Sequence, residues 1–172
     1  MSNWRERLAE ELPVFGHRNW IVVADAAYPA QCRPGIETLA TGEGQIDVLR
    51  EVLEAVLKAR HVRPVIYLDA ELDHVPEEHA AGIGEYRKEL AALLAHDSVK
   101  RLAHEQIIAL LDEAGTMFRV LMLKTDLVLP YTSVFIRLDC GYWSDEGEKA
   151  LRDRMKPARK ARKAGAKGQR RR

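Results

Sequence analysis

Residues 16–25 read Gly-His-Arg-Asn-Trp-Ile-Val-Val-Ala-Asp, and the apolar part of this stretch, residues 20–24, decides the fold. Its continuous run of large and β-branched side chains is typical of a strand that is buried on both faces of a sheet. A second run of the same kind, PVIYLD at residues 64–69, also ends in an aspartate. Asp25 is therefore predicted to stand at the carboxyl end of a central strand, where open α/β sheets bind their ligands.

The rest of the chain alternates between helical and strand patterns. Apolar residues repeat at three- and four-residue spacing over residues 45–60 and predict an amphipathic helix there. Further helices are expected at residues 3–12, 76–94, 104–111 and beyond Trp143, further strands at 99–102, 116–123 and 132–138, and a long Pro- and Gly-rich loop at 28–44. This alternation predicts an α/β fold: a single layered domain, residues 1–155, with a mostly parallel sheet flanked by helices.

The charges of the chain are unevenly distributed. The sequence has 27 Lys and Arg against 26 Asp and Glu, but residues 156–172 hold nine of the basic residues and no acid, which leaves residues 1–155 with a formal charge of −8. A nucleic-acid binder with a basic body is excluded by this split. We predict that Lys156–Arg172 is a disordered basic tail, which either makes weak non-specific contacts with nucleic acid or another anionic surface, or only aids solubility.

The sequence also bears on where the protein works. It contains no apolar run long enough to cross a bilayer and no visible secretory leader. Cys32 and Cys140 lie 108 positions apart and do not have the spacing of metal ligands. These features predict a cytoplasmic protein without membrane insertion.

Five polar residues are candidates for chemistry because of where they fall relative to the predicted elements. His17 precedes and Asp25 follows the first strand, so the two are separated by about 26 Å of extended chain and meet only if the chain folds back or across a subunit interface. His104 begins a predicted helix, and Tyr131 and Ser133 come just before a predicted strand. Hydroxyl groups at that place could bind a hydroxylated ligand, although turn formation and local hydrogen bonds explain these residues equally well.

A cluster of acids and histidines has the composition of a metal site. It consists of Asp69, Glu71, Asp73, His74 and His79. The two histidines have the spacing of a zinc half-site, but no Cys or His pair faces them, so helix N-terminal acids and solvated charge are the better explanation. The glycine-rich motifs of dinucleotide and P-loop sites are absent as well, and we expect neither a metal nor another cofactor.

The order of three short motifs resembles a known family. GHRNWIVVADAAYPAQ at residues 16–31, HEQ at 104–106 and PYTSVFIRL at 130–138 are similar to the RbsD/FucU family of sugar mutarotases, which includes D-ribose pyranase and L-fucose mutarotase. The resemblance covers most of the chain ahead of the basic tail. It implies an RbsD-like fold, a fucose- or ribose-like monosaccharide as substrate, and active sites shared between the subunits of a ring-like homo-oligomer.

The resemblance also implies roles for individual residues. His17 matches the catalytic histidine of the family. Opening a cyclic sugar requires such a group, because the anomeric hydroxyl must lose a proton and the ring oxygen must gain one. The positions that match substrate-binding residues are Asp25, His104, Lys124, Tyr131 and Ser133.

Three departures from the family pattern are visible. Asn19 stands where the family has an acid two residues after the histidine, and Ser133 stands where it has asparagine. The turn at residues 124–127, Lys-Thr-Asp-Leu, lacks the usual glycine. Two hypotheses follow: an isomerase of the mutarotase or pyranase type that uses histidine general acid/base catalysis, and a non-catalytic sugar- or metabolite-binding member of the same fold.

Overall fold

The computed structural model describes residues 3–95 and 98–156 of the chain. Contacts divide the chain after Tyr142 into two units, and the first of them holds the sheet and all predicted site residues. In the second unit, helix α5 (Asp145–Met155) begins after Ser144, whose hydroxyl accepts a hydrogen bond from the Gly147 amide. The predicted basic tail lies outside the described residues, apart from Lys156.

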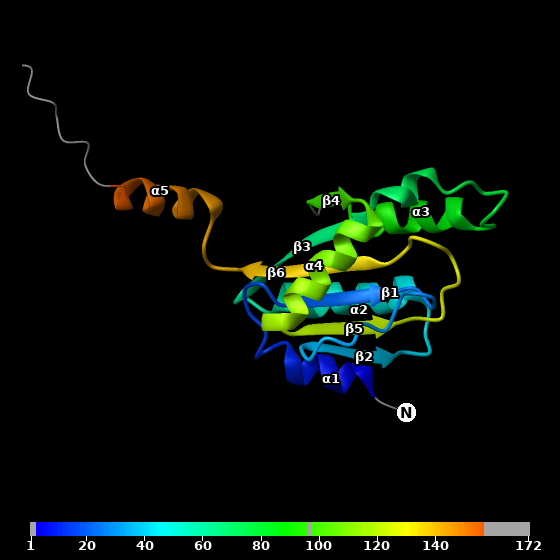
Figure 1. The fold of residues 1–172 in the computed structure, drawn as a ribbon, viewed down its shortest axis with the longest axis horizontal. Helices are drawn as coiled ribbons and strands as arrows, with labels where there is room; N and C mark the ends of the chain where they lie inside the picture. The colour runs from blue at the N-terminus through cyan, green and yellow to red at the C-terminus, as the bar shows by residue number, and fades with distance from the viewer. Residues whose placement is uncertain (1–2, 96–97, 157–172) are drawn as a thin grey trace, which may run out of the picture. The chain divides into compact units, whose positions relative to one another are not determined.

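A single mixed sheet of six strands forms the centre of the first unit. The strands are β1 (Trp20–Ala24), β2 (Ile36–Ala40), β3 (Val62–Asp69), β4 (Val99–Leu102), β5 (Val120–Lys124) and β6 (Val134–Cys140), and they lie in the order β2-β5-β1-β6-β3-β4 (Figure 1). β5 runs parallel to β1 and β2, and β3 runs parallel to β4. β6 lies between β1 and β3 and is antiparallel to both. The predicted mostly parallel sheet is therefore confirmed.

Helices cover both faces of the sheet. Alternate residues of β1 separate the two cores: Ile21 and Val23 pack with α1 (Trp4–Glu11), α2 (Gln45–Lys58) and α3 (Ile83–Leu93), whereas Trp20 and Val22 pack with α4 (His104–Met117). In Figure 1, α4 crosses in front of the sheet and α2 runs behind it. All of β1 is buried, as the apolar run predicts. Among the described helices, none is long and apolar enough to span a membrane.

Strand β2 corrects the prediction of a loop over residues 28–44. It lies at the edge of the sheet and is mostly half-buried, so its sequence lacks the apolar run that marks the central strands. The packing of β2 also explains why α4 is longer than the helix predicted at residues 104–111. A Cβ atom on Gly115 would lie 2.5 Å from Ile36 Cγ1, so this glycine allows β2 to approach α4 and does not end the helix. α4 therefore runs on to Met117, and β5 begins later than the predicted residue 116.

The helix predicted for residues 76–94 also begins later than expected. Residues 70–74 form a short 3-10 helix, η1 (Ala70–His74), and α3 starts only at Ile83. Gly82 precedes it in the left-handed region, with φ of +93°. The Glu77 carboxylate accepts hydrogen bonds from the amides of Gly82 and Gly84, which lowers its pKa and closes the turn ahead of α3. A proline at residue 76 thus opens a turn here, not a helix.

The strand directions decide which predicted residues can meet. β1, β3 and β5 end at the same edge of the sheet, so Asp25, Asp69 and Lys124 lie along this carboxyl edge. Ser133 comes immediately before β6, which begins at that edge because it runs antiparallel. His17 precedes β1 and lies at the opposite edge.

Candidate functional site

Asp25 is fixed at the carboxyl edge by β6. Its Oδ2 accepts a hydrogen bond of 2.7 Å from Ser133 Oγ, and its backbone amide donates one of 3.1 Å to the same hydroxyl oxygen. Its Oδ1 accepts a third hydrogen bond from the Ala27 amide. Asp25 is 8% exposed and Ser133 is fully buried. Ser133 therefore sets the orientation of the Asp25 carboxylate, which keeps lone pairs available for a further donor.

His104 lies at the start of α4, beside Asp69, a second carboxylate of the same edge. Both oxygens of Glu71 accept from the His104 backbone amide at 3.1 Å, which satisfies one of the free amides at the helix start. The imidazole Nδ1 lies 3.1 Å from Asp69 Oδ2. The ring also makes edge contacts with Tyr28 and Tyr131, at centroid distances of 6.0 and 5.4 Å. These contacts fix both the backbone of His104 and the orientation of its imidazole ring.

Asp69 is the most deeply buried acid of the carboxyl edge, with 0% of its side chain exposed. Burial raises its pKa to about 6, and the neighbouring His104 limits that rise. The interpretation of residues 69–79 as solvated charge is therefore wrong for Asp69. Sequence reasoning could have identified it, because it follows the buried run of β3 as Asp25 follows that of β1.

Tyr28 and Tyr131 complete the edge. Lys124 Nζ donates a 2.7 Å hydrogen bond to the Tyr28 carbonyl, which brings the end of β5 against the chain that follows β1. Burial raises the pKa of Tyr28, and the charges of Asp69 and Asp25 raise it further. Tyr131 is partly exposed, and its φ of +58° is a backbone conformation that residues other than glycine rarely adopt.

A buried polar network supports this edge from the other face of the sheet. Gln45 Nε2 donates to the Tyr86 hydroxyl and to the Thr132 carbonyl, and Tyr86 donates to the same carbonyl at 2.6 Å. Thr125 Oγ1 lies within hydrogen-bonding distance of Gln45 Oε1 and the Ala24 carbonyl. The network ties the segment before β6 to α2, α3 and the end of β1.

The Tyr86→Phe variant is expected to lower the free energy of unfolding by about 1–2 kcal/mol, because it removes a buried hydroxyl that accepts one hydrogen bond and donates another. Urea denaturation at neutral pH measures the change. Tyr142→Phe is the matched control, since Tyr142 is 80% exposed and its variant should stay within about 0.5 kcal/mol of the parent. Equal stability of the two variants would contradict the importance of the network.

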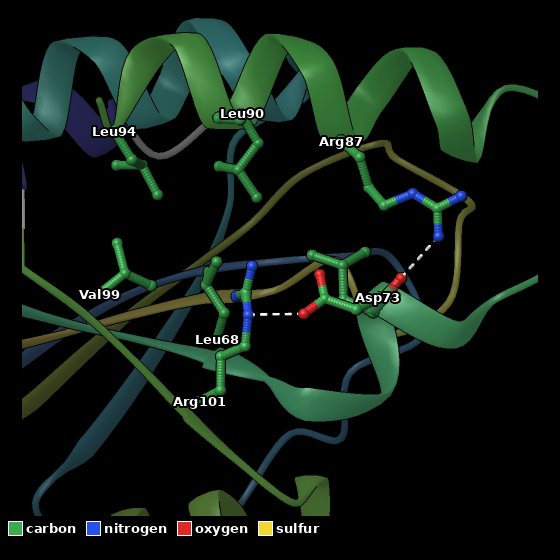
Figure 2. Close-up of a pocket in the computed structure, with 9 residues that line it drawn as sticks. Leu68, Asp73, Arg87, Leu90, Leu94, Val99 and Arg101 are labelled. Carbon is green, nitrogen blue, oxygen red and sulfur yellow. Dashed lines mark hydrogen bonds and ion pairs between the residues drawn. The ribbon is translucent and has the colours of Figure 1, made fainter.

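A cavity of about 380 Å³ lies between α3, β4 and η1 and is lined mainly by apolar side chains (Figure 2). The charged side chains that line the cavity are paired with other groups of the protein. Arg101 Nε lies 2.6 Å from an Asp73 oxygen, and Arg87 Nη1 donates to the Leu72 and Val75 carbonyls. The predicted site residues do not line this cavity. The two arginines instead hold η1, which directly follows Asp69 and contains Glu71.

Two acids of the candidate metal cluster pair with basic side chains of the protein. Asp73 pairs with Arg101, and Asp69 pairs with His104. Within residues 3–95 and 98–156, no group of three or more His, Cys, Asp or Glu side chains is placed to hold a metal ion.

His17 stands apart from these residues, at the opposite end of β1. Its Nδ1 lies 2.8 Å from Asp139 Oδ1, and its Nε2 accepts a hydrogen bond from Arg18 Nε. Because Nε2 accepts, the proton of the neutral ring is on Nδ1 and is donated to Asp139. More than half of the His17 side chain is exposed. β1 separates His17 from Asp25 by about 16 Å or more, so one protomer does not bring the two together.

Asp139 is a residue that the sequence reasoning missed. Hydrogen bonds between Arg18 and Leu138 and between Leu138 and Asn19 place the end of β6 beside the turn that carries His17. Asn19 holds this turn, because its Oδ1 accepts from the Gly16 amide. His17 therefore has a carboxylate partner that comes from β6, and no local sequence signal could have revealed this.

The fold and the site define an α/β protein with a polar carboxyl edge that gathers carboxylate, imidazole and hydroxyl groups. The chain belongs to the RbsD / FucU transport protein family, whose model matches residues 5–135. The predicted resemblance is therefore confirmed. No curated protein sequence matches the chain.

Solved structures show the same fold. RbsD from Bacillus subtilis, complexed with D-ribose, matches with a TM-score of 0.55 and 22% identity over 81% of this chain and 94% of that one. The fucose mutarotase from Streptococcus pneumoniae, in complex with L-fucose, matches with a TM-score of 0.51 and 19% identity over 77% and 91%. FucU from Bifidobacterium longum matches with a TM-score of 0.50 and 15% identity over 78% and 94%.

Proposed function

We propose that the protein is a monosaccharide isomerase of the mutarotase or pyranase type, which interconverts the anomers, or the pyranose and furanose forms, of a ribose- or fucose-like sugar. The observation that carries the proposal is that Asp25 and Asp69 share one edge of the sheet, where the His104 imidazole contacts both Asp69 and Tyr131. Carboxylate, imidazole and phenol groups together can bind several sugar hydroxyls. Family membership and the sugar complexes of two structural relatives support this choice.

His17 is the proposed catalytic residue. Interconversion removes a proton from the anomeric hydroxyl and delivers one to the ring oxygen, and an imidazole performs such transfers near neutral pH. Asp139 accepts a hydrogen bond from the Nδ1–H group of His17, so the lone pair on Nε2 is the one that can act as a base. It becomes accessible once the Arg18 side chain, which donates to it, moves aside. Asn19 therefore does not deprive His17 of a carboxylate partner, and this argues for catalysis over the non-catalytic alternative.

Asp25, Tyr131, Lys124 and His104 are proposed to contact the sugar, with Ser133 acting through Asp25. Because His17 lies at the other end of β1, we infer that it reaches the sugar bound by a second copy of the chain. A ring-like homo-oligomer, in which each site takes its two halves from neighbouring copies, meets this requirement.

Backbone conformation supports the same two halves. Among the described residues, Arg18 and Tyr131 are the non-glycine residues with positive φ, at +76° and +58°. Each such residue costs about 1–3 kcal/mol, and strain of this kind gathers at functional sites. One of them adjoins His17 and the other contacts His104.

Saturation-transfer NMR tests the proposal with the full-length protein and a panel of sugars that includes D-ribose and L-fucose. We expect faster exchange between sugar forms in the presence of the protein than in buffer, for at least one sugar. Exchange that stays at the buffer rate for the whole panel would overturn the proposal. Thermal stabilisation by a sugar without faster exchange would establish the non-catalytic alternative instead.

A further inference from the structure

We propose that Asp69 is a positioning residue for His104, which it holds as the Nδ1-protonated tautomer so that Nε2 serves as the second proton-transfer group of the site. The inference rests on the proposed function for its chemistry and on the carboxyl edge for its geometry. It assigns a task to a buried acid that is not among the proposed sugar contacts.

The Asp69 carboxylate serves a single group. Its Oδ2 lies 3.1 Å from His104 Nδ1, whereas its Oδ1 is buried and has no hydrogen-bond partner among the described residues. A buried polar atom without a partner costs about 1–3 kcal/mol, so an apolar side chain would suit this position better on grounds of stability alone. The acid is therefore retained for its contact with the imidazole.

The surroundings leave the imidazole one available nitrogen. Glu71 fixes the backbone amide of His104, and the rings of Tyr28 and Tyr131 contact the imidazole edge. Nδ1 is occupied by Asp69, while Nε2 has no protein partner within the described part of the chain. Since 23% of the side chain is exposed, Nε2 is the atom that can meet a ligand at this edge.

The carboxylate itself is held rigidly. It ends β3, a central strand that pairs with both β4 and β6. The η1 segment that follows it is fixed by Arg87, which donates to the Leu72 and Val75 carbonyls, and by Arg101, which pairs with Asp73 (Figure 2). A carboxylate without solvent or rotational freedom imposes one orientation on the ring that it binds.

The chemistry of ring opening requires two proton-transfer groups. His17 Nε2 takes the proton from the anomeric hydroxyl as the carbonyl forms, and His17 becomes imidazolium. The bond between the anomeric carbon and the ring oxygen breaks, and that oxygen takes a proton from His104 Nε2, which has bound this proton from solvent beforehand and so returns to the neutral form protonated on Nδ1. His17 then releases its extra proton to solvent, and ring closure reverses these transfers. The Nδ1 proton stays on the Asp69 side throughout.

Long-range ¹H–¹⁵N correlation spectra of the ¹⁵N-histidine-labelled full-length protein test the tautomer directly. The wild-type protein is expected to show neutral His104 with its proton on Nδ1, and the Asp69→Asn variant is expected to lose this preference because the amide can donate to Nδ1. The His104→Ala variant assigns the signals. A wild-type protein with the proton on Nε2 would overturn the inference, even if the Asp69 variant did not fold.

Kinetics distinguish positioning from a purely structural role. Asp69→Asn is expected to lower kcat for sugar exchange by about 10²-fold, the low end of the contribution of one proton transfer, with KM unchanged because the sugar contacts remain. Asp47→Asn is the matched control, since it removes an exposed carboxylate on α2, across the sheet from α4. An unchanged kcat in Asp69→Asn would refute the inference. If the wild-type protein exchanges no sugar, the proposed function fails and the tautomer experiment alone decides.

Discussion

Replacement of His17 by alanine is expected to slow enzyme-dependent exchange between sugar forms by about 10²–10⁴-fold, the usual contribution of one general acid or base. The substitution removes the imidazole held by Asp139, while the turn remains closed through Asn19 and the Gly16 amide. Saturation-transfer NMR at a fixed sugar concentration measures the rate. A KM close to that of the wild-type protein is expected, since the proposed sugar contacts at the carboxyl edge remain.

His79→Ala is the control for this experiment, because His79 is an exposed histidine whose only ion pair within the described part of the chain is with the adjacent Glu78. It should exchange sugar at the wild-type rate. Co-expression of His17→Ala with Asp25→Asn tests whether neighbouring copies share a site, because mixed oligomers then contain intact sites, on the order of a quarter of the total. Wild-type activity of His17→Ala would exclude its catalytic role, and the absence of recovery in mixed oligomers would exclude sharing.

Replacement of Phe135 by alanine is expected to lower the free energy of unfolding by about 3–5 kcal/mol, the usual range for a buried phenylalanine. Phe135 lies in β6 between β1 and β3, is 0% exposed, and contacts the Tyr28 ring at a centroid distance of 5.6 Å. The loss combines the hydrophobic transfer of the ring with the cavity that remains. Urea denaturation followed by tryptophan fluorescence measures it.

Val128→Ala is the matched control, because Val128 is 85% exposed and its truncation should change stability by less than about 0.5 kcal/mol. A loss below about 1 kcal/mol in Phe135→Ala would mean that the core around β6 repacks around the smaller side chain.

Sequence patterns predicted the parts of the fold that depend on burial. The run at residues 20–24 predicted β1, and the spacing of apolar residues predicted α2, because in both cases the core demands a continuous apolar face. The helix predicted at residues 3–12 forms as α1, and the Asn3 side chain caps it by accepting a hydrogen bond from the Glu6 amide. β2 escaped detection because a half-buried edge strand needs no apolar run. The helix predicted at residues 104–111 is too short because Gly115 lies inside α4, where its lack of a side chain lets β2 pack closely.

The sequence predicted those residues of the candidate site that lie at the ends of recognisable strands and helices. Asp25 was located from the end of a buried strand and His104 from the start of a helix, and both lie at the carboxyl edge. Asp139 could not be located in this way, because it lies 122 positions from His17 in the chain and only the pairing of β6 with β1 brings the two together. Asp69 was open to the same reasoning as Asp25, because it ends the buried run of β3, but the acids that follow it favoured the interpretation as solvated charge.

The direction of β6 has a consequence for how the protein can vary. This strand begins beside Ser133 at the carboxyl edge and ends with Asp139 and Cys140 at the opposite edge. The number of residues in β6 therefore sets the distance between the two proposed half-sites. A one-residue insertion within it would reverse the inward and outward faces of the strand beyond that point and displace Asp139 from His17. Variation in sugar preference is therefore expected in the segments that flank β6, while the number of residues within the strand stays constant.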